Sequence, residues 1–311
     1  MKRIIKVYNE HHLGDQIFNF ILFNIIKSYL EENDIHIEYY CNDEHHDQLS
    51  EFNYSKNIKI ISINDPGDKG LRLWIGDPSF KINFYNYTEY GYFYNTFYVC
   101  FFNDFLKKVD IPRSIDKLEY TDPQIEERYK ALDSKYNGKY SDLDFLILNS
   151  TPRSGQYDKD DNKWNKLINK LNLKYKIVTS EKTDGVNCTC DDKLTVKDIQ
   201  AISAHSKKII AVNSGVFTVL FNKDTLDNVN VVYSFSDMSF YDHPKIVNKK
   251  EIDDLNFLAE DPESFQTMEF NNSNTIFFLI IALTTFLLLN INISKVIRYI
   301  KNRIRAFNII F

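Results

Sequence analysis

Two short turns, each between a predicted strand and a predicted helix, carry the residues in this sequence best suited to chemistry. The first is His-Leu-Gly-Asp at 12–15, between the strand pattern at 4–8 and an apolar helix at 15–32. The second is Asn-Ser-Gly at 213–215, after the strand pattern at 208–212. Such turns present backbone N–H groups, and the positive end of a helix dipole, at the carboxyl edge of a sheet. The pair predicts an anion-binding cleft between two nucleotide-binding-like halves.

Gly14 and Asp15 give the first turn its chemistry. Gly14 allows a tight turn and a close approach of a ligand to the backbone. Asp15 lies near a predicted helix N-terminus, where a negative charge is stabilised. One interpretation makes Asp15 a helix cap. The other makes it a general base in the cleft, which removes the proton of an acceptor hydroxyl.

Residues able to hold phosphate follow the predicted strands of the second half. Arg153 lies in the polar loop 150–156, and Lys163 begins the next helix; both could reach a diphosphate. Ser214 and Gly215 could offer a hydroxyl and backbone N–H groups to the same ligand. The alternatives are a solvated loop for 150–156 and an ordinary N-cap for Ser214.

Strands alternate with helices on both sides of a charged segment at 113–140, which implies a parallel sheet in each half. The segment at 113–140 is itself predicted to be a helix plus a linker. We therefore expect an α/β fold of two Rossmann-like domains facing a cleft, with an additional C-terminal apolar helix and basic tail. The expected domains are an N-terminal Rossmann-like domain at 1–138, a C-terminal one at 139–250, a linker at 251–273 and a tail at 274–311. The elements are predicted at 4–8, 15–32, 35–40, 58–63, 71–75, 95–109, 144–149, 163–171, 176–179, 196–205, 208–212, 216–221 and 230–233.

Composition and charge indicate the class of protein and its kind of partner. The chain has 311 residues, 43% of them hydrophobic, which is typical of globular proteins, and a net charge of −5, which argues against nucleic acid as a partner. Cys188 and Cys190 are too close in sequence for an unstrained local disulfide and lack a second pair of zinc ligands. Because this cysteine usage fits a reducing compartment, we expect the catalytic part of the chain to be cytoplasmic.

The C-terminal segment predicts contact with a membrane. No charged residue occurs in 271–294, whereas 295–305 holds Lys and Arg without any acid. An apolar helix at 274–293 is just long enough to span a bilayer, and the basic residues would bind lipid headgroups. We favour membrane association from the cytoplasmic side through 274–305, with a transmembrane helix as the alternative.

The motifs in this order resemble the heptosyltransferase-like branch of the GT-B glycosyltransferases, which is glycosyltransferase family 9-like. They are strand–LGD–helix, strand–PxSG–KW–helix, the Leu-Thr-x-x-Asp-Ile-x-x-Ile-Ser helix at 194–203, and strand–NSG. The resemblance covers roughly 4–30 and 144–235. It implies Asp15 as the catalytic base. For donor binding it implies Lys163 at the phosphates, Glu181 at the ribose and the turn of Asn213, Ser214 and Gly215 at the diphosphate.

Two positions depart from the family pattern. Asn213 replaces the usual Asp, and the His of the family's DTGxxH pattern is absent, with Thr218 and Val219 in that region. These departures bear on the heptose substrate more than on the fold.

The motifs that could bind a metal ion are poorly placed to do so. Asp142-Leu-Asp144 precedes its strand and Asp158-Lys-Asp160 lies in a long polar loop, so neither lies as a manganese DxD motif requires. The histidine pairs at 11–12 and 45–46 are expected to diverge. We therefore expect no metal and no other cofactor.

These observations favour a metal-independent glycosyltransferase that moves a hexosyl- or heptosyl-like sugar from a nucleotide-sugar donor to a hydroxyl on a glycan or lipid-linked acceptor. Gly14, Arg153, Lys163, Glu181, Asn213, Ser214 and Gly215 would bind the donor. The alternative is an inactive GT-B-like, membrane-linked protein that binds a nucleotide or sugar. A third possibility is another two-domain α/β enzyme, such as a nucleotide-sugar epimerase.

Overall fold

The computed structural model describes residues 2–65, 69–83, 85, 94–153, 155, 157–237 and 241–260. Residues Met1–Asp254 form one compact unit, which contains both predicted halves, and Leu255–Phe311 form another. The predicted apolar helix and basic tail at 274–311 lie outside the described residues, as does most of the predicted linker. Among the described residues, no helix is long and apolar enough to cross a membrane.

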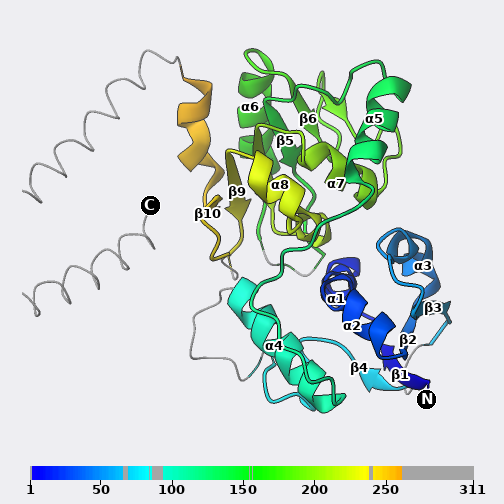
Figure 1. Cartoon of the computed structure of the whole chain (residues 1–311). Coiled ribbons are helices and arrows are strands. Elements are labelled where there is room, and N and C mark those ends of the chain that lie inside the picture. The colour runs from blue at the N-terminus through cyan, green and yellow to red at the C-terminus, as the bar shows by residue number, and fades with distance from the viewer. Residues whose placement is uncertain are drawn as a thin grey trace, which may run out of the picture. The chain divides into compact units, whose positions relative to one another are not determined.

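The N-terminal half is built on a parallel sheet of four strands in the order β3-β2-β1-β4 (Figure 1). Side chains of β2 are alternately buried and half-buried, which explains the alternating sequence pattern there. The strands are β1 (Arg3–Tyr8), β2 (Ile35–Cys41), β3 (Ile58–Ser62) and β4 (Leu71–Arg72), and the helices are α1 (Leu13–Ile25), α2 (Lys27–Glu32), α3 (Asp43–Ser50) and α4 (Tyr94–Lys108).

The C-terminal half is built on a parallel sheet of six strands in the order β10-β9-β8-β5-β6-β7. Every residue of β5 and β6 is buried, as expected for central parallel strands covered on both faces. The strands are β5 (Phe145–Leu148), β6 (Ile177–Thr179), β7 (Asn187–Cys188), β8 (Lys208–Val212), β9 (Val231–Phe235) and β10 (Ile246–Lys249). The helices are α5 (Ile125–Lys135), α6 (Asp161–Asn172), α7 (Val196–Ser203), α8 (Lys223–Asn228) and the 3₁₀ helices η1 (Gly215–Leu220) and η2 (Ile252–Ala259).

The α/β class and the parallel sheet in each half agree with the sequence prediction, but five elements were missed. The α3 segment reads Asp-Glu-His-His-Asp-Gln-Leu-Ser and buries only His45 and Leu49, so it has no apolar stripe to signal a helix. The others are β7, α8, β10 and η2, each of eight residues or fewer. The predicted helix at 15–32 is interrupted at Ile26. Cys188 and Cys190 form a disulfide, contrary to the expectation from their spacing.

The structure explains the Leu-Thr-x-x-Asp part of the helix motif at 194–203 by a helix cap. Thr195 caps α7: its Oγ1 accepts a hydrogen bond from the backbone N–H of Asp198 at 3.2 Å, and Asp198 Oδ2 accepts one from the N–H of Thr195 at 2.8 Å. This capping box fixes the start of the helix. Arg128 of α5 binds Asp198 at 2.6 Å and Glu51 at 2.8 Å, which ties this helix start to the N-terminal half.

A buried ion pair joins the two halves near the same helix. Lys197 of α7 binds Asp122, and the two side chains are 1% and 0% exposed. The Tyr54 hydroxyl donates to Asp122 Oδ1 at 2.7 Å, and the ammonium of Lys197 lies 4.5 Å from the Phe52 ring centroid. Tyr54 and Phe52 belong to the N-terminal half, whereas Asp122 lies in the segment between the halves. The packing of the two halves and of the segment between them therefore depends on one desolvated charge pair.

Candidate active site

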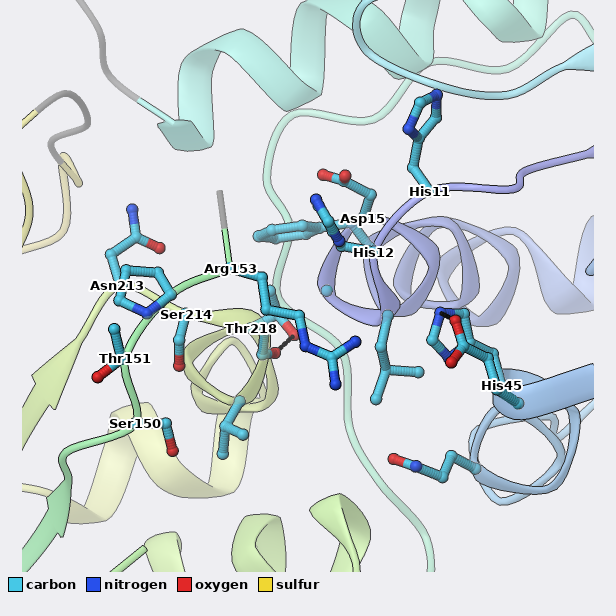
Figure 2. Close-up of a pocket in the computed structure, with 18 of the residues that line it drawn as sticks. His11, His12, Asp15, His45, Ser150, Thr151, Arg153, Asn213, Ser214 and Thr218 are labelled. Atoms are coloured by element: carbon cyan, nitrogen blue, oxygen red, sulfur yellow. Dashed lines mark hydrogen bonds and ion pairs between the residues drawn. The ribbon is translucent and has the colours of Figure 1, made fainter. Parts of the chain in front are cut away.

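A cleft of about 590 Å³ lies where the carboxyl ends of the strands in the two halves meet (Figure 2). The N-terminal half contributes the loop after β1, the start of α1 and part of α3. The C-terminal half contributes the loop after β5 and the turn from β8 into η1. The lining residues are Glu10, His11, His12, Leu13, Gly14, Asp15, Phe18, Glu44, His45, Gln48, Ser150, Thr151, Pro152, Arg153, Asn213, Ser214, Gly215, Val216 and Thr218.

The two glycine turns touch each other at the floor of this cleft. A Cβ atom at Gly14 would lie 2.8 Å from Cα of Gly215 and 3.3 Å from Cγ2 of Thr218. A Cβ at Gly215 would meet the backbone N of Gly14 at 3.4 Å, which is an ordinary contact. Gly14 is thus required for the close approach of the two halves, not only for the shape of its own turn.

We expect Gly14→Ala to destabilise the protein by about 1–3 kcal/mol, because the added methyl group overlaps backbone that cannot rotate away. Gly215→Ala is the matched control on the other side of the same contact and should cost less. Urea unfolding of the full chain measures both. Equal stability of Gly14→Ala and the wild type would contradict the contact.

Asp15 is held by an aromatic hydroxyl and does not cap the helix. The N-cap of α1 is His12, whose side chain makes no capping hydrogen bond, and Asp15 is the third residue of the helix. The Tyr98 hydroxyl donates to Asp15 Oδ1 at 3.0 Å. Burial raises the pKa of Asp15 to about 6, against the opposing effects of the Tyr98 hydrogen bond and the charge of His12. The result is a half-buried carboxylate, facing the cleft, that is more basic than an exposed one.

Tyr98 is well placed to set this basicity. It lies on α4, is 1% exposed, and stacks on Phe18 with the ring centroids 4.0 Å apart. Because its hydrogen bond favours the ionised carboxylate, Tyr98→Phe should raise the pKa of Asp15 further. The acid limb of the kcat/KM profile should then move to higher pH. An unmoved limb, in a variant of normal stability, would contradict the coupling.

The second turn contains polar atoms without partners. Asn213 is 3% exposed; its Oδ1 accepts from the Tyr241 hydroxyl at 2.9 Å, and its N–H donates to the carbonyl of Phe235 at 2.9 Å. Its Nδ2 and the Oγ of Ser214 are buried and have no hydrogen-bond partner. Ser214 precedes η1 without capping it through its side chain. An unpaired buried polar group costs about 1–3 kcal/mol, so these atoms favour a ligand with acceptor oxygens at this turn.

Arg153 supplies a cation from the C-terminal half. It is exposed, lies in the loop that follows β5, and extends toward the N-terminal half between Thr218 and His45 (Figure 2). Its charge is one of the causes that lower the pKa of His45 on α3, after burial, so the two side chains interact across the cleft. An anion bound here would meet the guanidinium without any rearrangement of the fold.

Two predicted donor residues are not among those lining the cleft. Lys163 Nζ pairs with Asp253 at 3.0 Å and with Glu251 at 3.6 Å. Glu181 Oε2 lies 3.6 Å from Lys159 Nζ, and its carboxylate remains half-exposed. Their roles in donor binding stay predictions.

Sequence reasoning missed two features near the cleft. Lys159, whose side chain is 6% exposed, donates to the carbonyl of Asn149 at 2.7 Å at the end of β5. Lys159 lies between Asp158 and Asp160, so the local sequence pattern indicates only a possible metal motif there. The second missed feature is α3, whose residues line the cleft although no apolar periodicity predicts a helix there. In the described part of the chain, no group of three or more His, Cys, Asp and Glu side chains is arranged to hold a metal ion.

Comparison with solved structures identifies the fold. The chain is similar to a glycosyl transferase family 9 protein from Veillonella parvula DSM 2008, with 12% identity, 87% of this chain and 91% of that chain covered, and a TM-score of 0.51. It is also similar to the Escherichia coli ADP-heptose LPS heptosyltransferase II, with 10% identity, coverage of 81% and 91%, and a TM-score of 0.51. No family model matches the sequence, and no curated protein matches it.

The fold is therefore that of the heptosyltransferase-like GT-B glycosyltransferases. The resemblance inferred from the motifs at 12–15, 163–164, 194–203 and 213–215 is confirmed at the level of the fold.

Proposed function

We propose that this protein is a glycosyltransferase that moves a sugar from a nucleotide-sugar donor to a hydroxyl group of an acceptor. One observation carries the proposal. Asp15, a carboxylate of raised pKa, faces the same cleft as the unpartnered polar atoms of Asn213 and Ser214, and the turns that hold them are in contact. A base and an anion-binding turn that line the same cleft suit group transfer from a phosphate leaving group.

The proposed reaction follows from the chemistry of these groups. The acceptor oxygen attacks the anomeric carbon of the donor sugar, the bond from that carbon to the diphosphate oxygen breaks, and Asp15 takes the hydroxyl proton. The diphosphate departs with its negative charge near Arg153, Ser214 and the backbone N–H of Gly215. This arrangement supports a metal-independent reaction, and Gly14 allows the contact that holds Asp15 close to the diphosphate turn. Lys163 and Glu181 would join the donor site only after leaving their present ion pairs.

A donor screen on the full chain tests the proposal. Thermal stability is measured with ADP-, UDP- and GDP-sugars, and mass spectrometry then follows hydrolysis of any donor that binds. One nucleotide sugar should both stabilise the wild type and be hydrolysed slowly. Ser214→Ala and Arg153→Ala should weaken that stabilisation. A chain that responds to none of the donors would refute the proposal.

An inactive binding protein is the second candidate, and it has a specific basis. Asn213 stands where the family pattern has Asp, and Thr218 occupies the region of the missing His, where its hydroxyl donates to the carbonyl of Gly215 at 2.7 Å. Donor binding that is accompanied neither by hydrolysis nor by transfer to an acceptor would favour this candidate. An epimerase would convert the donor sugar without an acceptor present.

We also propose that the segment 274–305 attaches the protein to a membrane from the cytoplasmic side. Its support is the sequence alone: an uncharged apolar stretch followed by five cations, Lys295, Arg298, Lys301, Arg303 and Arg305. The full chain should sediment with liposomes that contain anionic lipid, and replacing the five cations by Gln should weaken this binding. A full chain that stays in the supernatant would overturn the proposal.

A further inference from the structure

The two sides of the cleft carry different charges. The C-terminal half contributes Arg153 and no acid to the lining. The N-terminal half contributes three carboxylates, those of Glu10, Asp15 and Glu44, and neither a Lys nor an Arg. Glu44 is the most accessible of the three, with 64% of its side chain exposed. An anion is therefore favoured on one side of the cleft and opposed on the other.

The nearest cation of the N-terminal half is already occupied. The guanidinium of Arg72 binds Glu10 Oε1, lies 2.7 Å from Nε2 of His11, and stacks over the Trp74 ring at 4.7 Å. It therefore neutralises Glu10 and leaves the charges of Asp15 and Glu44 unmatched by Lys or Arg on this side. The undescribed segments 66–68, 84 and 86–93 of this half add no Lys or Arg in sequence.

Two of the three histidines that line this side, His11 and His45, do not supply the missing charge. The charge of the third, His12, acts on Asp15, whose pKa it lowers. Burial lowers the pKa of His11 and of His45, against the opposing effects of Glu10 and Glu44, so both rings are mainly neutral at pH 7. Neutral imidazoles, together with the amide of Gln48, can donate hydrogen bonds to hydroxyl groups and accept them. These groups match a polyhydroxylated ligand better than an anionic one.

Resting on the proposed function, we propose that the acceptor is an uncharged sugar, bound through its hydroxyl groups beside Asp15 and Glu44, and that a phosphate group on this sugar opposes binding. The donor diphosphate and the acceptor thus differ in charge, and each half of the cleft selects one of them. This sorting also keeps the donor from binding in reverse.

The test compares methyl glucoside, methyl galactoside, methyl mannoside and methyl N-acetylglucosaminide with their 6-phosphates. Binding to the full chain is measured by ligand-detected NMR at low salt, with inorganic pyrophosphate present to fill the diphosphate site. At least one uncharged glycoside should bind, and more tightly than its 6-phosphate by on the order of tenfold. Glu44→Lys should narrow or reverse this difference, whereas Glu32→Lys, the same change at an exposed position of α2 outside the cleft, should leave it intact.

Tighter binding of the phosphorylated sugars to the wild type would overturn the inference, and so would the absence of binding by every uncharged glycoside. An equal effect of the two charge reversals would also overturn it, because the effect would then come from net charge. The donor screen fails or succeeds independently, so a wrong acceptor class is distinguishable from a wrong function.

Discussion

Asp15→Asn should lower the rate of sugar transfer by orders of magnitude while the fold is retained. A general base contributes about 10²- to 10⁴-fold to a rate, and Asn cannot accept the proton. The amide has the size of the carboxylate, and its oxygen can still accept the hydrogen bond from Tyr98. Turnover with the donor found in the screen is the measurement. Donor-induced thermal stabilisation is the control, because the proposed diphosphate site lies on the opposite half.

The pH dependence of the wild type gives a second test of the same residue. Asp15 must be ionised to act as a base, and burial raises its pKa to about 6. We therefore expect kcat/KM to fall as pH drops through about 6, with no such limb in the residual activity of Asp15→Asn. The raised pKa also means that ionisation of Asp15 destabilises the folded state above this pH. Asp15→Asn should thus be no less stable at pH 7; near-normal turnover would eliminate Asp15 as the base.

Lys197→Ala should destabilise the protein by about 3–5 kcal/mol, the range observed when one partner of a buried ion pair is removed. Asp122 would then lose its cationic partner inside the buried contact between the halves. Burial lowers the pKa of Lys197 to about 8, so its ammonium is still mainly charged at pH 7. Urea unfolding of the full chain measures the loss, and a single transition would show that the halves unfold together.

Two further variants test whether the buried charge pair causes the loss of stability in Lys197→Ala. Lys197→Met combined with Asp122→Asn removes both charges and keeps an acceptor for Tyr54, so it should recover most of the stability. Lys130→Ala breaks an exposed pair with Glu126 and should change stability by less than about 1 kcal/mol. A loss of the same size in Lys197→Ala and in Lys130→Ala would contradict the structural role of the buried pair.

The sequence predicted those elements whose side chains show a strong period. The alternation of β2, the fully apolar β5 and the apolar stripe of α6 each identify one element and its buried face. The two small-residue turns could be located because a strand, a turn and a helix follow one another within about fifteen residues. Parallel sheets bring the carboxyl ends of their strands to one edge, so Asp15 and Ser214 could be assigned to one cleft.

The remaining features depend on contacts between distant segments. The sequence around Gly14 does not predict its contact with Gly215. The sequence around Asp15 likewise does not predict the hydrogen bond from the hydroxyl of Tyr98. The polar helix α3 forms without an apolar stripe, and its contribution to the cleft was invisible for that reason. Such tertiary contacts override local pattern, so they could only be found in three dimensions.

The strand order of the six-stranded sheet has a consequence for biosynthesis. The centre of that sheet pairs β5 with β8, so that Phe145 lies beside Lys208 in register. While the ribosome is still making the chain between them, one edge of the very apolar β5 has no partner, and a long loop must close before it gains one. The nascent C-terminal half therefore passes through a stage with an exposed, aggregation-prone strand, at which assistance from a chaperone would matter most.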